Sequence, residues 1–149
     1  MEEQIVETPI WTDIVTVGSK VSLRRTVSES DVYLFAGVTG DMHPNHIDQA
    51  YMAKGQFGQR VVHGALLIGL MSGASTKYAL SRNPMPDSVS LGYDRVRFIA
   101  PAFFGDTITV NYEITEIVLE KDRAIASIEV RNQDDKLLAV AQHLTKYIR

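Results

Sequence analysis

One carboxylic acid and two imidazoles fall within six residues of this sequence: Asp41, His43 and His46, with Pro44 between the imidazoles. An imidazole has an intrinsic pKa of about 6.5, so His46 suits a general base at neutral pH. A carboxylate close by can hold a water molecule and supply or shuttle a second proton. The pair of Asp41 and His46 therefore predicts proton-transfer chemistry on a small polarised substrate such as a carbonyl compound.

A second candidate segment, Val61-Val62-His63-Gly64, opens a run of apolar and small residues that continues to Leu80. The start of a helix offers unpaired N–H groups and a positive dipole end. Because glycine allows close approach of the backbone, Gly64 suits a site that receives a developing negative charge. His63 fits a hydrogen-bonding group at the start of this helix.

Several of these residues could instead have a structural or a metal-binding role. Asp41 could cap the following helix, and His46 could be a structural hydrogen-bonding group. His43, His46 and either Asp41 or Asp48 are also residue types that bind metals. Proton transfer to a carbonyl compound needs no metal, so we predict none.

The acid and the base lie at a break between two predicted helices. Residues 28–31 form a capping-box pattern that starts the first helix, and Gly40 is a natural stop. Pro44 suits the first turn of a second short helix that ends near Gly55. This break lets the two side chains point at one place, which a single continuous helix would prevent.

The rest of the sequence predicts a long helix and a sheet. Residues 61–80 are apolar on all sides, which predicts a helix buried on most of its surface. Alternating apolar residues predict strands, namely 21–27, 88–99, 108–114, 123–131 and 136–148, with a tight turn at 132–135. One long buried helix with consecutive strands indicates an α+β fold, an antiparallel sheet wrapped around a helix.

Several motifs agree in order and spacing with one known family. They are Phe35-Ala36…Thr39-Gly40-Asp41…Pro44…His46…Asp48, then Phe57-Gly58…Val61-Val62-His63-Gly64, and later Phe98…Pro101…Gly105-Asp106-Thr107. Over roughly residues 20–148 the chain resembles MaoC-like proteins and R-specific enoyl-CoA hydratases. The resemblance implies the hot-dog fold, and we expect one such domain over residues 1–149. Pro9 and Gly18 predict that residues 1–19 form an irregular N-terminal arm.

The same resemblance implies an activity and a set of site residues. The reaction would be reversible addition of water to a trans-2-enoyl thioester, giving an (R)-3-hydroxyacyl thioester. By position, Asp41 and His46 match the catalytic pair, and Gly64 matches the residue whose backbone N–H receives the thioester oxygen, beside His63. Ser72 falls where family members have a site-lining serine, although it could also be a small packing residue. The sequence departs from the family at His43, where an asparagine is usual.

The composition of the chain limits the binding partners and the cellular location that we expect for the protein. The net charge is −3, so no general basic surface predicts binding to nucleic acid. The chain has no cysteine, which excludes disulfides and thiolate metal sites. No apolar run has the roughly 20 residues that span a bilayer, and Met1-Glu2-Glu3-Gln4 lacks the pattern of a signal peptide. We therefore expect a cytoplasmic protein without membrane association and with no cofactor beyond the coenzyme A or acyl carrier protein that bears the substrate.

Two other functions remain open at this point. Hot-dog domains also serve as non-catalytic acyl-thioester-binding modules, and others are thioesterases. A hot-dog thioesterase usually carries its carboxylate on the central helix, yet residues 61–80 contain neither Asp nor Glu. We also expect a homodimer or higher homo-oligomer, because one sheet around one helix leaves an edge strand and an open groove to be covered.

Overall fold

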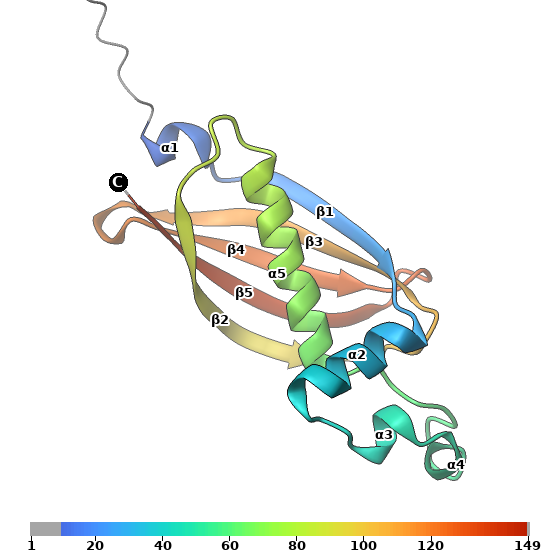
Figure 1. The fold of residues 1–149 in the computed structure, drawn as a ribbon. Coiled ribbons are helices and arrows are strands. Elements are labelled where there is room, and N and C mark those ends of the chain that lie inside the picture. The colour runs from blue at the N-terminus through green and yellow to red at the C-terminus, as the bar shows by residue number, and fades with distance from the viewer. Residues whose placement is uncertain (1–9, 149) are drawn as a thin grey trace, which may run out of the picture.

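The fold is a single curved antiparallel sheet that wraps around one long helix (Figure 1). The computed structural model describes residues 10–148. Within this range the sheet has five strands in the order β1-β3-β4-β5-β2. In chain order the elements are α1 (Trp11–Ile14), β1 (Lys20–Thr26), α2 (Glu29–Thr39), α3 (Pro44–Ile47), α4 (Gln49–Met52), α5 (Gly64–Leu80), β2 (Ser88–Phe98), β3 (Thr107–Val118), η1 (Leu119–Lys121), β4 (Arg123–Arg131) and β5 (Leu137–Tyr147). The α+β hot-dog architecture predicted from the sequence is confirmed.

The central helix α5 packs mainly against β1 and β3. It begins at Gly64, three residues later than predicted, because Val61 instead forms a single bridge with Phe103 and His63 occupies the N-cap position. Its buried face consists of Leu67, Met71, Ala74 and Tyr78, so the expectation of a helix buried on most of its surface is wrong for this chain. No helix within residues 10–148 has the length and apolar character needed to cross a membrane.

The two helices α2 and α3, which flank the turn with the acid and of which α3 carries the base, lie at the N-terminal end of α5 (Figure 1). The predicted capping box at the start of α2 is present, since the Ser28 side chain accepts from the Asp31 N–H and the Asp31 side chain accepts from the Ser28 N–H. Gly40 ends this helix in the left-handed conformation, at φ 76°.

The single short helix expected after Pro44 is two helices instead. Asp48 has an extended backbone conformation that ends α3, and its carboxylate then caps α4 by accepting from the Tyr51 N–H at 2.9 Å. An aspartate that satisfies the free N–H groups of a new helix favours this interruption over continuation.

The N-terminal arm differs from the irregular segment that was expected. Residues 1–9 lie outside the described residues, but residues 11–14 form α1. Trp11 is buried and stacks on Tyr147 with 4.5 Å between ring centroids, and its indole nitrogen donates to Asp122 Oδ1 at 3.3 Å. Burial of this one aromatic ring explains why the arm is ordered there.

A polar group lies in the core beneath α5, at His143 on β5. Its side chain is fully enclosed, with Nδ1 2.8 Å from the Tyr112 hydroxyl and Nε2 2.8 Å from Ser90 Oγ. The Tyr93 ring stacks on the imidazole at a centroid distance of 4.6 Å. Burial lowers the pKa of His143 to about 4, so the imidazole is neutral at physiological pH.

This imidazole should make stability fall at acidic pH. Between the unfolded pKa of about 6.5 and the folded pKa of about 4, the unfolded chain binds the extra proton. The stabilisation is therefore complete above pH 6.5 and decreases as the pH falls towards 4, by about 3 kcal/mol. His143→Gln keeps hydrogen-bonding groups but does not titrate, so the variant should show a shallower decline.

Chemical denaturation of both proteins at a series of pH values between 7 and 4.5 measures this difference. Every other titrating group is common to the two proteins, so the comparison concerns the pH slope rather than the absolute stability. Parallel curves for the wild type and His143→Gln would show that the folded imidazole titrates normally.

Candidate active site

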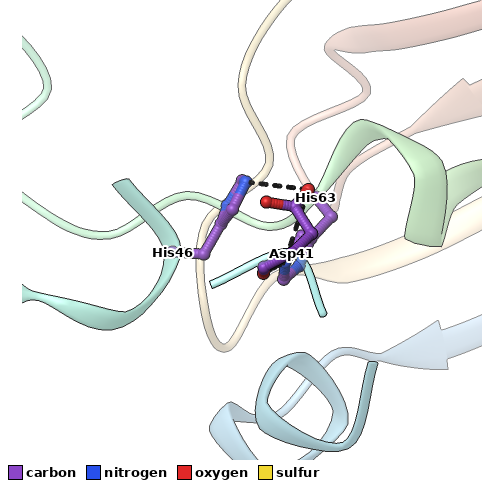
Figure 2. Close-up of side chains that lie close together, drawn as sticks. All are labelled: Asp41, His46 and His63. Carbon is purple, nitrogen blue, oxygen red and sulfur yellow. Dashed lines mark hydrogen bonds and ion pairs between the residues drawn. The ribbon is translucent and has the colours of Figure 1, made fainter. Parts of the chain in front are cut away.

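Three side chains from separate parts of the chain meet at one point: Asp41, His46 and His63 (Figure 2). Asp41 lies in the turn after α2, His46 lies on α3, and His63 is the N-cap of α5. Asp41 Oδ2 is 3.9 Å from His46 Nε2 and 4.0 Å from His63 Nε2. The two imidazole rings stack with 3.6 Å between their centroids. The structure thus brings together the predicted acid, the predicted base and the predicted helix-start histidine.

His46 is held as a neutral base. Its Nδ1 is 2.7 Å from the Val61 carbonyl oxygen, which can only accept, so Nδ1 carries the proton and Nε2 presents a lone pair. Burial lowers the pKa of His46, and nearby His63 acts in the same direction. The Val61 hydrogen bond and the charge of Asp41 oppose this, but the net direction is downward. At neutral pH the imidazole is therefore ready to accept a proton at Nε2.

The gap between Asp41 and His46 is suited to a small molecule. At 3.9 Å the two atoms are too far apart for a direct hydrogen bond. Asp41 has 49% of its side chain exposed, whereas the His46 side chain is 10% exposed. One group thus faces solvent and the other the interior, an arrangement in which a water molecule can contact both.

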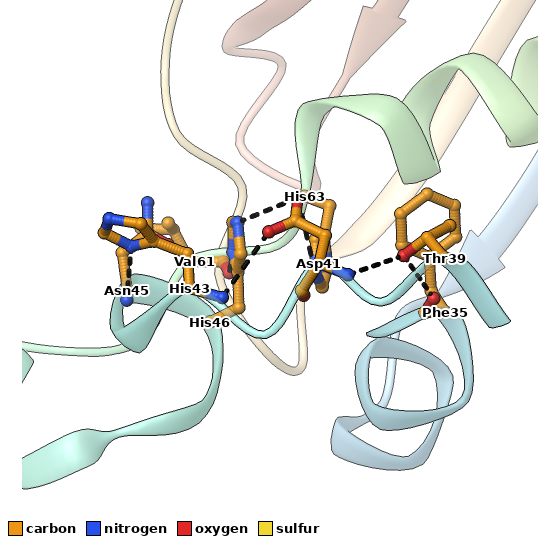
Figure 3. Close-up of polar contacts among 8 residues, drawn as sticks. All are labelled: Phe35, Thr39, Asp41, His43, Asn45, His46, Val61 and His63. Atoms are coloured by element: carbon orange, nitrogen blue, oxygen red, sulfur yellow. Dashed lines mark hydrogen bonds and ion pairs between the residues drawn. The ribbon is translucent and has the colours of Figure 1, made fainter. Parts of the chain in front are cut away.

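His63 positions Asp41 through the backbone rather than through the carboxylate. His63 Nε2 donates to the Asp41 carbonyl oxygen at 2.9 Å, and the Asp41 N–H donates to Thr39 Oγ1 at 3.2 Å (Figure 3). The Thr39 hydroxyl in turn donates to the Phe35 carbonyl at the end of α2. Within residues 10–148, His63 Nδ1 has no hydrogen-bond partner. The bonds from His63 and to Thr39 hold the backbone of Asp41 on both sides, and so fix the turn that carries the carboxylate. The sequence analysis did not identify this positioning role of Thr39.

His43 lies at the edge of this group and acts locally. It is exposed and forms the N-cap of α3, where its Nδ1 accepts from the Asn45 N–H at 3.1 Å (Figure 3). Its ring centroid is 6.4 Å from that of His46. The side chain thus replaces the usual small N-cap residue and lies outside the cluster of Asp41, His46 and His63.

A cavity of about 360 Å³ opens beside His46. Its walls are mainly apolar and include Phe57, Leu67, Phe98 and Ile99, with Gly64 on the central helix. A Cβ atom added at Gly64 would lie 2.5 Å from the Phe98 ring. The glycine is thus needed for the contact between α5 and Phe98, a neighbour that the sequence analysis did not identify.

Ser72 lies elsewhere in the fold. It is two turns beyond Gly64 on α5, is exposed, and lines a different cavity together with residues of β2 and β5. The structure therefore does not bring Ser72 to the acid and the base.

The acid and the two imidazoles also have the composition of a metal site. One ligand atom from each of Asp41, His46 and His63 lies within 4.8 Å of the others. Binding through His63 Nε2 would require the loss of its hydrogen bond to the Asp41 carbonyl, and His46 Nε2 is the nitrogen left for proton transfer. The sequence-based expectation of no metal stays a prediction, which a chelator can test.

The MaoC like domain matches residues 14–136 of this chain. The chain belongs to the MaoC-like dehydratase family. This family comprises hydratases and dehydratases that act on acyl thioesters. Its match covers the turn with Asp41, the helix with His46 and the whole of α5.

Individual MaoC-like relatives agree with this assignment. An (R)-specific enoyl-CoA hydratase of Rhodospirillum rubrum is 36% identical over 104 residues, covering 70% of this chain and 69% of the relative. A 3-hydroxybutyryl-CoA dehydratase of Methylorubrum extorquens is 33% identical over 115 residues, covering 77% and 70%. The solved (R)-hydratase of A. caviae superimposes with a TM-score of 0.79 at 30% identity, covering 89% of this chain and 96% of that one.

Replacing His43 should leave the chemistry of this MaoC-like site intact. Asparagine is a strong N-cap residue, so His43→Asn should preserve the start of α3 and the position of His46. We expect kcat/KM for an acyl-thioester substrate to change by less than about threefold, well below the 10²–10⁴ effect of a general acid or base. A loss as large as that of His46→Ala would identify His43 as the base instead.

Proposed function

We propose that this protein catalyses the (R)-specific hydration of trans-2-enoyl-CoA, or the reverse dehydration of 3-hydroxyacyl thioesters. The observation that carries the proposal is the convergence of a solvent-facing carboxylate and a buried neutral imidazole, 3.9 Å apart, beside an apolar cavity. Relatives at similar identity that are hydratases and dehydratases support it. A homodimer or higher homo-oligomer and a cytoplasmic location stay predictions.

In the proposed mechanism a water molecule binds between Asp41 Oδ2 and His46 Nε2. His46 Nε2 takes one proton from the water as its oxygen bonds to C3 and the π bond between C2 and C3 breaks. The imidazolium then gives up this proton, which passes by way of the Asp41 carboxylate to C2, so both residues return to their starting states. One O–H bond of water is broken, and one C–O and one C–H bond form, so the net reaction adds water across the double bond. The nearby carboxylate stabilises the imidazolium that forms during the step.

The thioester oxygen would be received at the N-terminus of α5. Gly64 lies in the first turn, where a helix leaves N–H groups without intrahelical acceptors, and within residues 10–148 its N–H has no other acceptor. Gly64 also lines the cavity beside His46. The positive end of the helix dipole would favour the negative charge that develops on that oxygen.

Two alternatives predict different products. A thioesterase would release coenzyme A with a free thiol, yet α5 carries no acidic residue. A binding module would leave the thioester unchanged, and it would not need a buried neutral base beside a carboxylate. Crotonyl-CoA distinguishes the three functions, because hydration removes the enoyl absorbance without releasing a thiol.

Substitution of either member of the pair should remove the activity and keep the fold. We expect Asp41→Asn and His46→Ala each to lower kcat/KM for crotonyl-CoA at least about a hundredfold, the usual contribution of a general acid or base. The double variant should lose little more, since both residues act on one water molecule. The rate should be unchanged in EDTA, because neither proton transfer requires a metal.

The controls for this test are His43→Asn and the circular dichroism spectra of all variants. Near-normal turnover by either Asp41→Asn or His46→Ala, with an unchanged spectrum, would contradict the assignment. A rate that falls in EDTA and returns on addition of a divalent metal would show that the three side chains serve as ligands.

The role of Gly64 can be separated from its packing with Phe98. Gly64→Ala alone should lower both the melting temperature and kcat/KM, because the new methyl collides with the Phe98 ring. In Gly64→Ala/Phe98→Ala that collision is gone, so the melting temperature should return to that of Phe98→Ala. If the Gly64 N–H holds the thioester oxygen, kcat/KM should stay at least about tenfold below that of Phe98→Ala.

This comparison has one outcome against the proposal. Equal kcat/KM values for Phe98→Ala and the double variant would mean that Gly64 is small only to accommodate Phe98. The thioester oxygen would then have to be received elsewhere.

A further inference from the structure

A second cavity, of about 200 Å³, lies farther along α5 than the candidate active site. Residues of the same two elements, α5 and β2, line both this cavity and the first one. Gly64 of α5 and Phe98 of β2 line the first cavity, whereas Ser72 and Ser75 of α5 and Ser88 and Ser90 of β2 line the second. From Gly64 to Ser72 the helix rises roughly 12 Å. The two cavities therefore follow one another in the space between α5 and β2.

The lining of this second cavity is polar but uncharged. Except for Ala79, each lining residue carries a hydroxyl or an imidazole: Ser72, Ser75, Thr76, Tyr78, Ser88, Ser90, Tyr112, His143, Thr145 and Tyr147. No Asp, Glu, Lys or Arg is among them, and burial keeps His143 neutral at physiological pH. This composition contrasts with the mainly apolar cavity beside His46.

Part of the polar lining is fixed in place by internal hydrogen bonds. His143 contacts Tyr112 and Ser90 at 2.8 Å each, and Tyr93, whose ring stacks on His143, interacts with Ser72 through its hydroxyl. These bonds hold the wall in one arrangement without help from a ligand. The mechanism proposed above uses none of these groups.

Other polar groups in the same wall remain available to a ligand. Ser75 donates its proton to the Ser72 carbonyl at 2.8 Å, so its oxygen can still accept. The hydroxyls of Thr76 and Ser88 make no hydrogen bond with any residue in the range 10–148. The cavity thus offers both donors and acceptors to an incoming group.

We propose that this cavity receives the distal part of the acyl group and selects acyl groups that carry an uncharged hydrogen-bonding group, such as a hydroxyl or a keto oxygen. The inference rests on the proposed function, since it requires an acyl thioester at the site. A plain alkyl tail would displace water from these hydroxyls without replacing its hydrogen bonds. A terminal carboxylate would find no opposite charge there.

Saturated acyl-CoA probes test this selectivity without turnover. Isothermal titration calorimetry would compare butanoyl-, hexanoyl- and octanoyl-CoA with the same three compounds bearing a terminal hydroxyl, and with adipoyl-CoA as the charged six-carbon probe. We expect the hydroxylated compound to bind at least about fivefold more tightly at the length that reaches the cavity, the effect of one or two net hydrogen bonds. Adipoyl-CoA should bind more weakly than the six-carbon hydroxy compound.

Substitutions in the cavity wall test whether its hydroxyl groups cause this selectivity. In Ser75→Ala/Thr76→Val two hydroxyls that remain available to a ligand are removed with little change of volume, so the preference for the hydroxyl should disappear and the alkyl probes should bind equally or more tightly. Ser127→Ala is the matched control, since Ser127 is an exposed hydroxyl on β4 outside this cavity. It should bind every probe as the wild type does.

The outcomes separate this inference from the proposed function. Alkyl probes that bind as tightly as their hydroxy partners at all three lengths, or a preference that survives in Ser75→Ala/Thr76→Val, would overturn the selectivity. If the enzyme nevertheless hydrates crotonyl-CoA, the proposed function stands. Absence of both binding and turnover with every thioester would overturn the two together.

Discussion

The candidate site depends on the three residues 61–63, to which both the acid and the base are tied. The Val61 carbonyl accepts from His46, and His63 donates to the Asp41 carbonyl. This segment is itself held by the loop between β2 and β3. Val61 forms a β-bridge with Phe103, and the Val62 N–H donates to the Ala102 carbonyl at 2.8 Å. The exposed turn that bears Asp41 is thereby held in a fixed position relative to the core. Proton transfer over a short distance requires such a fixed position.

The close packing of two imidazoles determines the electrostatics of the site. His46 and His63 stack at 3.6 Å in a buried position, so a positive charge on His46 is opposed both by burial and by its neighbour. The Val61 carbonyl at Nδ1 and the Asp41 carboxylate near Nε2 favour that charge. The base is therefore neutral at rest, and the charge it gains in a reaction is stabilised at both ring nitrogens. A water molecule that gives its proton to Nε2 would have to lie on the side of the carboxylate.

Features set by neighbours in the sequence could be predicted, and features set by distant residues could not. The capping box at 28–31, the stop at Gly40 and the alternating strands are local patterns, and the spacing of Asp41 and His46 already indicated a pair. The bond from His63 to the Asp41 backbone joins residues 22 positions apart. The contact of Phe98 with Gly64 and the network around His143 likewise join separate strands and the helix. No local pattern marks them, because side chains that meet only after folding leave no spacing in the sequence.

The position of α5 relative to the sheet explains why both cavities lie along one side of the helix. The helix packs on β1 and β3 through its face of large and buried residues, and the flank of that face towards β2 carries Gly64, Ser72 and Ser75. The small side chains of Ser72 and Ser75 leave space between helix and strand that larger ones would fill, whereas the Phe98 ring packs directly against Gly64. Such residues are poor helix formers, so their presence in the central helix costs stability that the packing of Met71 and Tyr78 offsets. A helix that served only as a core element would be more stable with larger apolar residues on that side. The stability lost through the small residues is explained if the space beside them receives a substrate.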